Sequence, residues 1–343
     1  MTTTPVVRAL GTLAHDRAHA APAAACGCAA PQVLADRPDG TVVRSGPVVA
    51  KAHASGTDAA ALAARLSLAA SPHLAGILLP PLDGTHPSAP VPRVPAPARP
   101  GPPPPDPAAG LRTVDGRAVS LWPYGEPVDP ADPDAAPWEE AAALLAALHR
   151  TRPPRPLPPM RGPAKAALAV TRMCAARPGG PDTRAVLAAW RGLPAWARDE
   201  GPAPAGRTGF LCHGDLHLGQ LVRHPAPHGP WLLIDVDDTG LGDPAWDLAR
   251  PAAWYAAGLL PTEDWLRFLA AYRDRGGPAV RPEGDPWPEL DVPARALTVQ
   301  TAALALARSR AQRREPDESE QLMVDACVRI AALPPRSAAG HAS

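Results

Sequence analysis

A predicted pair of folded-back strands restricts the fold of this chain more than any other part of its sequence. Leu221–His224 and Trp231–Asp235 are apolar runs on the two sides of the loop Pro225–Pro230, and this pattern indicates a β-hairpin. If the loop is symmetric, Gln220 lies opposite Asp235 at the open end of the hairpin. Cross-strand neighbours are about 5 Å apart, so we expect these two side chains to lie close enough to share one cation.

The residue types at this end of the hairpin favour phosphoryl transfer. Gln220 and Asp235 offer an amide oxygen and a carboxylate, which are hard ligands suited to Mg²⁺. Asp215, five residues before Gln220, supplies a second carboxylate that can accept a proton from an attacking hydroxyl.

A positive group for nucleotide phosphates is predicted at Lys51, on the apolar strand Val48–His53. The chain contains no Asn, and its only lysines are Lys51 and Lys165 against many arginines. A lysine retained within an apolar strand therefore needs a functional reason, and phosphate binding supplies one.

Three sequence blocks carry a family resemblance. His213–Gln220 reads His-Gly-Asp-Leu-His-Leu-Gly-Gln, Ile234–Asp238 reads Ile-Asp-Val-Asp-Asp, and Gly242–Ala249 reads Gly-Asp-Pro-Ala-Trp-Asp-Leu-Ala. In this order the blocks resemble the aminoglycoside phosphotransferase family, and the similarity extends more loosely over residues 31–335. It implies an α+β, protein-kinase-like two-lobed fold, with a small antiparallel-sheet N-lobe and a larger helical C-lobe. It also implies an enzyme that phosphorylates hydroxyls of small molecules.

The resemblance assigns roles to individual residues. By position, Asp215 is similar to the family's catalytic base, Asp235 to its main metal-binding Asp, and Lys51 to its phosphate-binding lysine. Gln220 stands where the family usually has a metal-binding Asn, and it keeps the amide oxygen. The helix Glu that usually pairs with the lysine has no counterpart, since the following helix offers only Asp58.

Ser120–Tyr124 resembles the hinge strand that offers backbone groups to the adenine of the nucleotide. Leu121, Trp122 and Tyr124 are therefore the expected nucleotide contacts. Pro123 has no N–H, so the hydrogen-bond donor must be another residue, such as Tyr124. No Gly-rich loop marks the nucleotide, so the implied cofactors are Mg²⁺ and either ATP or GTP.

The predicted domain organisation follows from changes of composition along the chain. Proline accounts for 49 of the 343 residues and is densest in a segment expected to be an exposed loop of the N-lobe. The expected parts are an Ala-rich N-terminal segment (1–30), a nucleotide-binding N-lobe (31–122, with the Pro-rich loop at 80–110), a hinge or linker (123–137), a helical C-lobe with the catalytic loop (138–335) and a tail (336–343).

Short β-rich runs between turn residues predict strands, and Ala/Leu-rich amphipathic runs predict helices. Strands are expected at 33–37, 41–44, 48–53, 75–79, 111–114 and 118–122, and helices at 57–70, 138–150, 164–176, 183–198, 244–257, 263–275, 292–314 and 319–332.

Composition argues against several other classes of protein. Lys plus Arg and Asp plus Glu both total 34, so no net basic field attracts a nucleic acid. No apolar run reaches the roughly 18 residues of a membrane span. The five cysteines are an odd number and do not indicate a disulfide framework, so a reducing cytoplasm is the expected location. Cys26 and Cys28 form a Cys-x-Cys pair, which alone is a weak metal signal.

Two other functions remain open. A metal-dependent hydrolase would use His213, Asp215 and His217 with Asp235 and Asp237, because His-x-Asp-x-His can gather a transition metal. A non-catalytic member that binds nucleotide is suggested by the missing helix Glu. For a kinase, the partner is a small-molecule hydroxyl substrate such as an aminoglycoside, a sugar or an amino alcohol. The sequence does not choose among these acceptors and does not indicate an oligomeric state.

Overall fold

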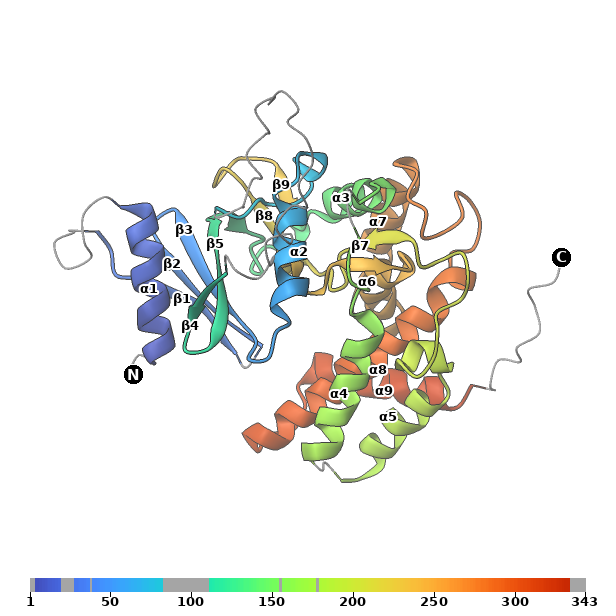
Figure 1. Cartoon of the computed structure of the whole chain (residues 1–343). Helices are drawn as coiled ribbons and strands as arrows, with labels where there is room; N and C mark the ends of the chain where they lie inside the picture. Colours follow the sequence, from blue (N-terminus) through green and yellow to red (C-terminus); the bar gives the residue numbers. More distant parts are fainter. Residues whose placement is uncertain are drawn as a thin grey trace, which may run out of the picture. The chain divides into compact units, whose positions relative to one another are not determined.

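The computed structural model describes residues 4–19, 28–37, 39–82, 111–153, 156–176 and 179–333. Most of the predicted Pro-rich loop, Cys26 and the predicted tail at 336–343 lie outside the described residues. The chain divides into two compact units, each built from more than one stretch of sequence (Figure 1). Unit 1 contains the described residues of Met1–Ala135, Pro153–Pro158 and Gly219–Asp237, and unit 2 those of Ala136–Arg152, Pro159–Leu218 and Asp238–Ser343.

Unit 1 is built around a five-stranded antiparallel sheet with the strand order β1-β2-β3-β5-β4. Asp115 and Gly116 join β4 to β5, and both have positive φ, 51° and 71°, as a two-residue hairpin turn requires. The elements of unit 1 are α1 (Pro5–Ala18), β1 (Gln32–Arg37), β2 (Gly40–Ser45), β3 (Val48–His53), α2 (Ala59–Ala69), β4 (Arg112–Val114), β5 (Arg117–Pro123), β6 (Glu126–Pro127), β8 (Leu221–Arg223) and β9 (Trp231–Leu233).

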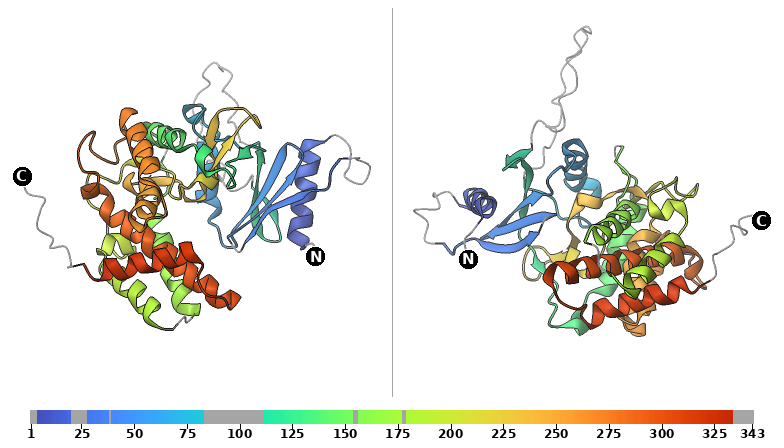
Figure 2. Two further views of the ribbon diagram at one scale, coloured as in Figure 1. Left: turned by 180° about the vertical axis from the view of Figure 1, so that it is seen from behind. Right: turned by 90° about the horizontal axis from the view of Figure 1, so that it is seen from below.

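Helix α1 lies along one face of this sheet (Figures 1 and 2). The sequence predicted no element for residues 1–30. Thr4 caps the helix by accepting a hydrogen bond from the backbone of Val7, and Pro5 occupies the first turn. The apolar face of α1 packs on alternate residues of the sheet, and the resulting core contains Val7, Leu10, Ala14, Val43, Val48, Ala50, Ala52, Val119 and Leu121.

The strand predicted at 75–79 is wrong. A 3-10 turn at Pro72–Leu74 follows Ser71, and Gly76 adopts a left-handed φ of 79°. Only Leu78 makes a bridge, a parallel one to Leu233. The turn after α2 thus leaves too little extended backbone for a strand.

The predicted hairpin is present as β8 and β9, with β6 on the other side of β8. Its register differs by one residue from the symmetric prediction, because Leu221 pairs with Leu233. Gln220 is therefore opposite Ile234, whose N–H donates to the Gln220 carbonyl at 2.9 Å, and is not opposite Asp235.

The loop of this hairpin explains the shift. His224 donates its N–H to the carbonyl of Pro230 at 3.1 Å, and Gly229 donates to Pro225 at 2.7 Å. Pro230 thus continues the strand and leaves a loop of residues 225–229. A Cβ at Gly229 would lie 2.2 Å from the His224 carbonyl, so this closure requires glycine.

Unit 2 is mainly helical, and α8 contacts α4, α6 and α9, while α3 packs on α7 (Figure 2). Helix α5 is shorter than predicted because Gly192 and Pro194 follow its last turn. The elements are α3 (Trp138–Arg150), α4 (Gly162–Ala176), α5 (Pro181–Arg191), β7 (Phe210–Cys212), β10 (Gly240–Gly242), α6 (Ala245–Ala257), α7 (Thr262–Asp274), α8 (Trp287–Gln312) and α9 (Glu318–Ala331). Within the described residues, none of the helices has the length and apolar character needed to span a bilayer.

Candidate active site

Lys51 of unit 1 joins a cluster with two carboxylates that lie far along the chain. Alternate residues of β3 are buried under α1, so Lys51 points to the opposite face of the sheet. Its Nζ lies 2.7 Å from Asp235 Oδ1 and 3.2 Å from Asp237 Oδ2. Burial alone would lower the pKa of Lys51, but the two carboxylates outweigh burial and raise that pKa above its usual value. The ammonium therefore stays charged at neutral pH.

Asp58 is the acidic residue nearest to the helix position where the family usually has the Glu that pairs with the lysine. It does not contact Lys51. It caps α2 by accepting hydrogen bonds from the N–H groups of Ala60 and Ala61, at 2.9 and 3.0 Å. The partners of the lysine come from the segment after β9.

The two carboxylates retain oxygen atoms with capacity for a ligand. Asp235 uses Oδ1 both for Lys51 and for the N–H of Asp237, at 3.4 Å. Asp237 uses Oδ2 for Lys51 and His53, whereas its Oδ1 is buried without a hydrogen-bond partner among the described residues. A buried carboxylate oxygen without a partner is costly, and a cation bound here would offset that cost.

Asp235 itself has a left-handed backbone, with φ of 64°. This conformation costs a non-glycine residue about 1–3 kcal/mol and is concentrated at functional sites. Asp235 follows the end of β9, just before the chain turns into the 3-10 segment Val236–Asp238. The strained turn places two carboxylates, from Asp235 and Asp237, on the same lysine.

His53, on the same face of β3 as Lys51, continues the cluster toward β5. Its Nδ1 lies 2.9 Å from Asp237 Oδ2 and its Nε2 lies 2.8 Å from Ser120 Oγ. Trp122 donates its indole N–H to the same Ser120 oxygen at 2.8 Å. One assignment of hydrogen-bond directions satisfies every group: Ser120 donates to Nε2, and His53 donates from Nδ1 to the carboxylate. Burial alone would raise the pKa of Asp237, but Lys51 and His53 lower it.

Gln220, the predicted amide ligand, ends the 3-10 turn Leu218–Gln220 and its side chain is buried. Its place is fixed by the backbone hydrogen bond to Ile234 and by the strand β8 that follows it. Gln220 and Asp235 thus both flank the hairpin within unit 1, at the starts and ends of its strands.

The predicted hinge residues lie on and after β5. Leu121 and Trp122 are buried, and the Leu121 carbonyl accepts a hydrogen bond from the N–H of Leu82 at 2.8 Å. The N–H of Tyr124 donates to the Pro47 carbonyl at 2.7 Å. In this conformation Tyr124 is therefore not an available backbone donor for an adenine.

Asp215 of unit 2 is held between two cations. Lys165 Nζ lies 2.6 Å from Asp215 Oδ2, and Arg250 Nη2 lies 2.6 Å from Oδ1. Lys165 also contacts Asp238 at 2.7 Å, and Arg250 Nε donates to the Leu216 carbonyl at 3.1 Å. Burial alone would raise the pKa of Asp215, but Lys165 and Arg250 lower that pKa to about 2. The carboxylate is thus ionised at neutral pH.

The backbone before Asp215 is anchored by a buried carboxylate. Asp247 accepts the N–H groups of His213 and Gly214, at 2.6 and 2.7 Å. Gly214 has a φ of 86°, and a Cβ there would lie 2.3 Å from the Asp238 carbonyl oxygen. Only glycine fits this turn, so the loop that carries Asp215 has a fixed path.

A chain of hydrogen bonds orients Asp247 in turn. Ala279 donates its N–H to the hydroxyl of Tyr272 at 3.0 Å, and that hydroxyl lies 2.7 Å from Nδ1 of His149. Tyr272 therefore donates to Nδ1, and His149 donates from Nε2 to Asp247 at 2.9 Å. Burial would raise the pKa of Asp247, but the His149 hydrogen bond lowers it.

Sequence reasoning missed Lys165 and Arg250. Lys165 is the second of the two lysines in a chain otherwise rich in arginine, and the same scarcity that pointed to Lys51 was available for it. Arg250 stands in α6 just after the third sequence block and differs in no local feature from the other arginines. Its role appears only when α6 places it beside Asp215.

The His-x-Asp-x-His residues proposed for a hydrolase do not form a metal-ligand group in the part of unit 2 that the structure describes. Among the described residues, His213, Asp215 and His217 are not part of any group of His, Cys and carboxylate ligands close enough to share an ion. Burial, with help from Arg250, lowers the pKa of His217 to about 4. In the described part of the chain, two groups of such ligands are close enough to share an ion: His15 with His19 and Cys28, and His149 with Cys212 and Asp247.

A recess of about 10 Å³, room for about one water molecule, lies beside Asp215 in unit 2. It is too small to hold a small-molecule substrate in this conformation. It is lined by Gly162, Gly214, Asp215, Leu216, Trp246, Arg250, Leu297 and Gln300.

Residues 41–287 match the model of the phosphotransferase enzyme family, APH. The match covers more than half of the chain. The chain belongs to this family. It is therefore a phosphotransferase that uses an alcohol group of a small molecule as acceptor, which confirms the family and the type of enzyme predicted from the sequence. No curated protein is a significant match to the sequence.

Solved structures share the fold of this phosphotransferase. A choline/ethanolamine kinase family protein from Mesorhizobium loti is 15% identical with a TM-score of 0.50, over 92% of this chain and 92% of that one. Spectinomycin phosphotransferase, in complex with ADP and spectinomycin, is 13% identical with a TM-score of 0.52, over 89% and 92%. A thermostable mutant of aminoglycoside phosphotransferase APH(4)-Ia, in a ternary complex with AMP-PNP and hygromycin B, is 14% identical with a TM-score of 0.54, over 89% and 95%. These similarities confirm the predicted protein-kinase-like fold class.

Proposed function

We propose that this phosphotransferase transfers the γ-phosphoryl group of ATP to a hydroxyl of an uncharged or acidic small molecule such as a sugar. The observation that carries the proposal is the cluster in which Lys51 meets Asp235 and Asp237. A charged lysine beside carboxylates with unused oxygens combines a phosphate contact with metal ligands, and phosphoryl transfer needs both. The spectinomycin phosphotransferase and APH(4)-Ia structures contain ADP and AMP-PNP, which supports an adenine nucleotide.

The residues after β9 fit Mg²⁺. Asp235 is about one-third exposed and contacts protein groups only through Oδ1 among the described residues, and Asp237 has a buried oxygen without a partner. With the amide oxygen of Gln220, these are oxygen donors of the kind that Mg²⁺ prefers. When bound, the ion supplies neutralisation of charge on the nucleotide phosphates. Lys51 then stabilises negative charge on the same phosphates from its place on β3.

Asp215 acts on the acceptor. Each carboxylate oxygen has a second lone-pair position, so the contacts to Lys165 and Arg250 leave room for a hydrogen bond from a substrate hydroxyl. The two cations keep Asp215 ionised and fix its direction. It thereby orients the hydroxyl for attack and accepts its proton as the new P–O bond forms.

The charges around Asp215 favour an acceptor without a positive charge. Lys165, Arg250 and Arg161 lie next to two carboxylates, with Arg161 Nη1 3.6 Å from Asp238 Oδ1. Three cations against two anions leave a positive excess on this side of unit 2. An amine placed here meets like charge, whereas neutral hydroxyls or a carboxylate do not.

The test is an assay of ADP and GDP release against neutral sugars, sugar acids, amino alcohols and aminoglycosides, with Mg²⁺ present and the product mass measured. We expect the highest kcat/KM with ATP and a neutral or acidic acceptor. Turnover restricted to cationic acceptors would overturn the acceptor class. Release of GDP without release of ADP would overturn the choice of nucleotide.

A further inference from the structure

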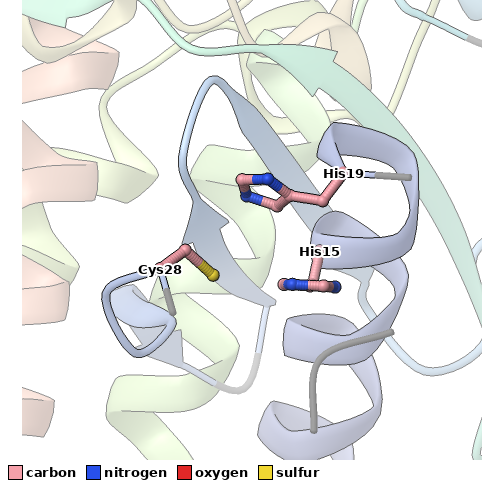
Figure 3. Close-up of side chains that lie close together, drawn as sticks. All are labelled: His15, His19 and Cys28. Carbon is pink, nitrogen blue, oxygen red and sulfur yellow. The ribbon is translucent and has the colours of Figure 1, made fainter. Parts of the chain in front are cut away.

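We propose that His15, His19 and Cys28 form a structural Zn²⁺ site in unit 1, separate from the phosphate cluster. One nitrogen from each imidazole and the sulfur of Cys28 lie within 4.8 Å of one another. Figure 3 shows both rings leaving α1 on the same side, with Cys28 reaching toward them from the segment before β1. Two imidazole nitrogens and one thiolate sulfur are a ligand set typical of zinc.

The helix itself brings the two histidines together. His15 lies in the last turn of α1, and His19, four positions further on, is the C-cap whose N–H donates to the His15 carbonyl at 2.9 Å. Residues at this spacing share one face of a helix. Their ring centroids are 4.6 Å apart with planes tilted by 31°, so both rings are already directed to the same region.

The surroundings of His19 lack the hydrogen bonds that its burial calls for. Its Nε2 is buried with no hydrogen-bond partner among the described residues, and so is the hydroxyl of Ser45 at the end of β2. The same nitrogen faces the turn after β2, since a Cβ at Gly46 would lie 3.4 Å from it. Buried polar atoms in folded proteins almost always have a partner, and a bound ion would provide one for His19.

The distances suit a site that closes when metal binds. In tetrahedral zinc the ligand nitrogen and sulfur atoms lie about 3.3–3.8 Å apart, so a present spacing of up to 4.8 Å has to contract by up to about 1.5 Å. Cys28 is exposed and His19 is half-buried, so both side chains have room to rotate. Asp16 Oδ1 lies 3.6 Å from His15 Nδ1. We take this carboxylate or a water as the fourth ligand of the zinc ion.

The position of the site indicates a stabilising role. It ties the end of α1 to the segment that enters β1, and α1 covers the face of β3 opposite to Lys51 and His53. Metal bound only in the folded state stabilises that state by mass action. We therefore expect zinc to raise the unfolding temperature of the protein without changing kcat.

The experiment uses the full-length, untagged protein, stripped of metal and titrated with Co²⁺ as a spectroscopic substitute for zinc. We expect one thiolate-to-cobalt charge-transfer band, saturating at one Co²⁺ per chain, and displacement by Zn²⁺. The oxygen ligands proposed for Mg²⁺ contain no sulfur and give no such band, so this result is independent of the kinase proposal.

Two variants at accessible positions, with one control, decide the assignment. Cys28→Ser should abolish the band, and His19→Gln should weaken Zn²⁺ binding by at least about 100-fold, because removing a ligand costs more than the 10–100-fold of an outer-shell change. Cys174→Ser, at an exposed cysteine of α4, should change neither. Absence of the band in the parent protein, its persistence in Cys28→Ser, or its loss in Cys174→Ser would overturn the site.

Discussion

Each unit holds one of the two lysines of the chain, and each lysine contacts two carboxylates. The two clusters differ in whether the oxygens of their carboxylates are all paired. In unit 1, Lys51 is surrounded by carboxylates that keep unused oxygens. In unit 2, Asp215 has a cation on each oxygen, Lys165 on one and Arg250 on the other. The first arrangement presents a positive charge and spare ligands, and the second presents an ionised carboxylate of fixed direction.

In the proposed mechanism, this difference lets one pair of residue types serve two halves of a reaction. Carboxylates would hold a lysine for phosphates in one unit, and cations would hold a carboxylate for a hydroxyl in the other. Asp237 and Asp238 are adjacent in sequence yet belong to different clusters. The chain thus passes from one cluster to the other within a single 3-10 turn.

The largest effect is expected from Asp215→Asn. The amide cannot accept the proton of the hydroxyl, so kcat should fall by about 10²–10⁴-fold, while binding of ATP measured by calorimetry stays within about twofold. Asp238→Asn, which also loses a contact to Lys165, is the matched control and should cost less than about tenfold in kcat. Near-normal turnover of Asp215→Asn would show that Asp215 is not the base.

Lys51→Met should lower kcat/KM for the nucleotide by about 10²-fold, the usual cost of removing one charged contact to the transition state. Lys165→Met removes the other lysine and should leave the nucleotide KM unchanged. Steady-state kinetics at varied ATP and saturating acceptor separate the two. Equal effects of both variants on nucleotide KM would contradict the division of roles between the clusters.

His53→Gln should raise the Mg²⁺ concentration needed for half-maximal activity and lower kcat/KM for the nucleotide by about tenfold. The reason is loss of a hydrogen bond to an ionised carboxylate, which is worth roughly 1.5–3 kcal/mol. His53 contacts Asp237 and Ser120 and no reacting group, so it is a positioning residue. An unchanged Mg²⁺ dependence, with only a lower unfolding temperature, would reduce it to a structural role.

Lys165→Met should have the smallest effect at neutral pH and a clear effect in acid. Burial favours the protonated form of Asp215, and Lys165 is its strongest opposing charge. Removing Lys165 therefore raises the pKa of Asp215 from about 2. In a plot of kcat against pH, the acid limb should then move up by at least about one pH unit. Arg161→Met, at a half-exposed arginine whose side chain pairs with Asp238, should leave the limb in place. A limb that does not move in Lys165→Met would contradict the assignment.

Local patterns were enough to predict most elements and to select Lys51 as a residue of interest. The helix at 138–150 was predicted with its observed bounds from its amphipathic Ala/Leu pattern, and the acidic residues of its first turn and basic residues of its last turn suit the helix dipole. Turn residues separated the strands of the unit 1 sheet correctly. Lys51 was found because a lysine is rare in this chain and improbable within an apolar strand.

Contacts between distant segments could not be predicted in the same way. The register of the hairpin depends on how Gly229 and Pro230 close the loop, and a count of loop residues does not contain that information. Arg250 meets Asp215 only through the packing of α6. The partners of Lys51 were sought in the following helix, whereas they come from 184 residues further along the chain.

The discontinuity of both units constrains how the gene can be divided. A fragment ending at Ala135 would encode Lys51 and His53 without the acidic residues that compensate them, which lie within Gly219–Asp237. Such a fragment would carry a buried ammonium with no counter-ion. Exchange between relatives by a single crossover at the linker therefore takes Lys51 and its acidic partners from different parents, and recombination that keeps this cluster intact requires that both stretches be inherited together.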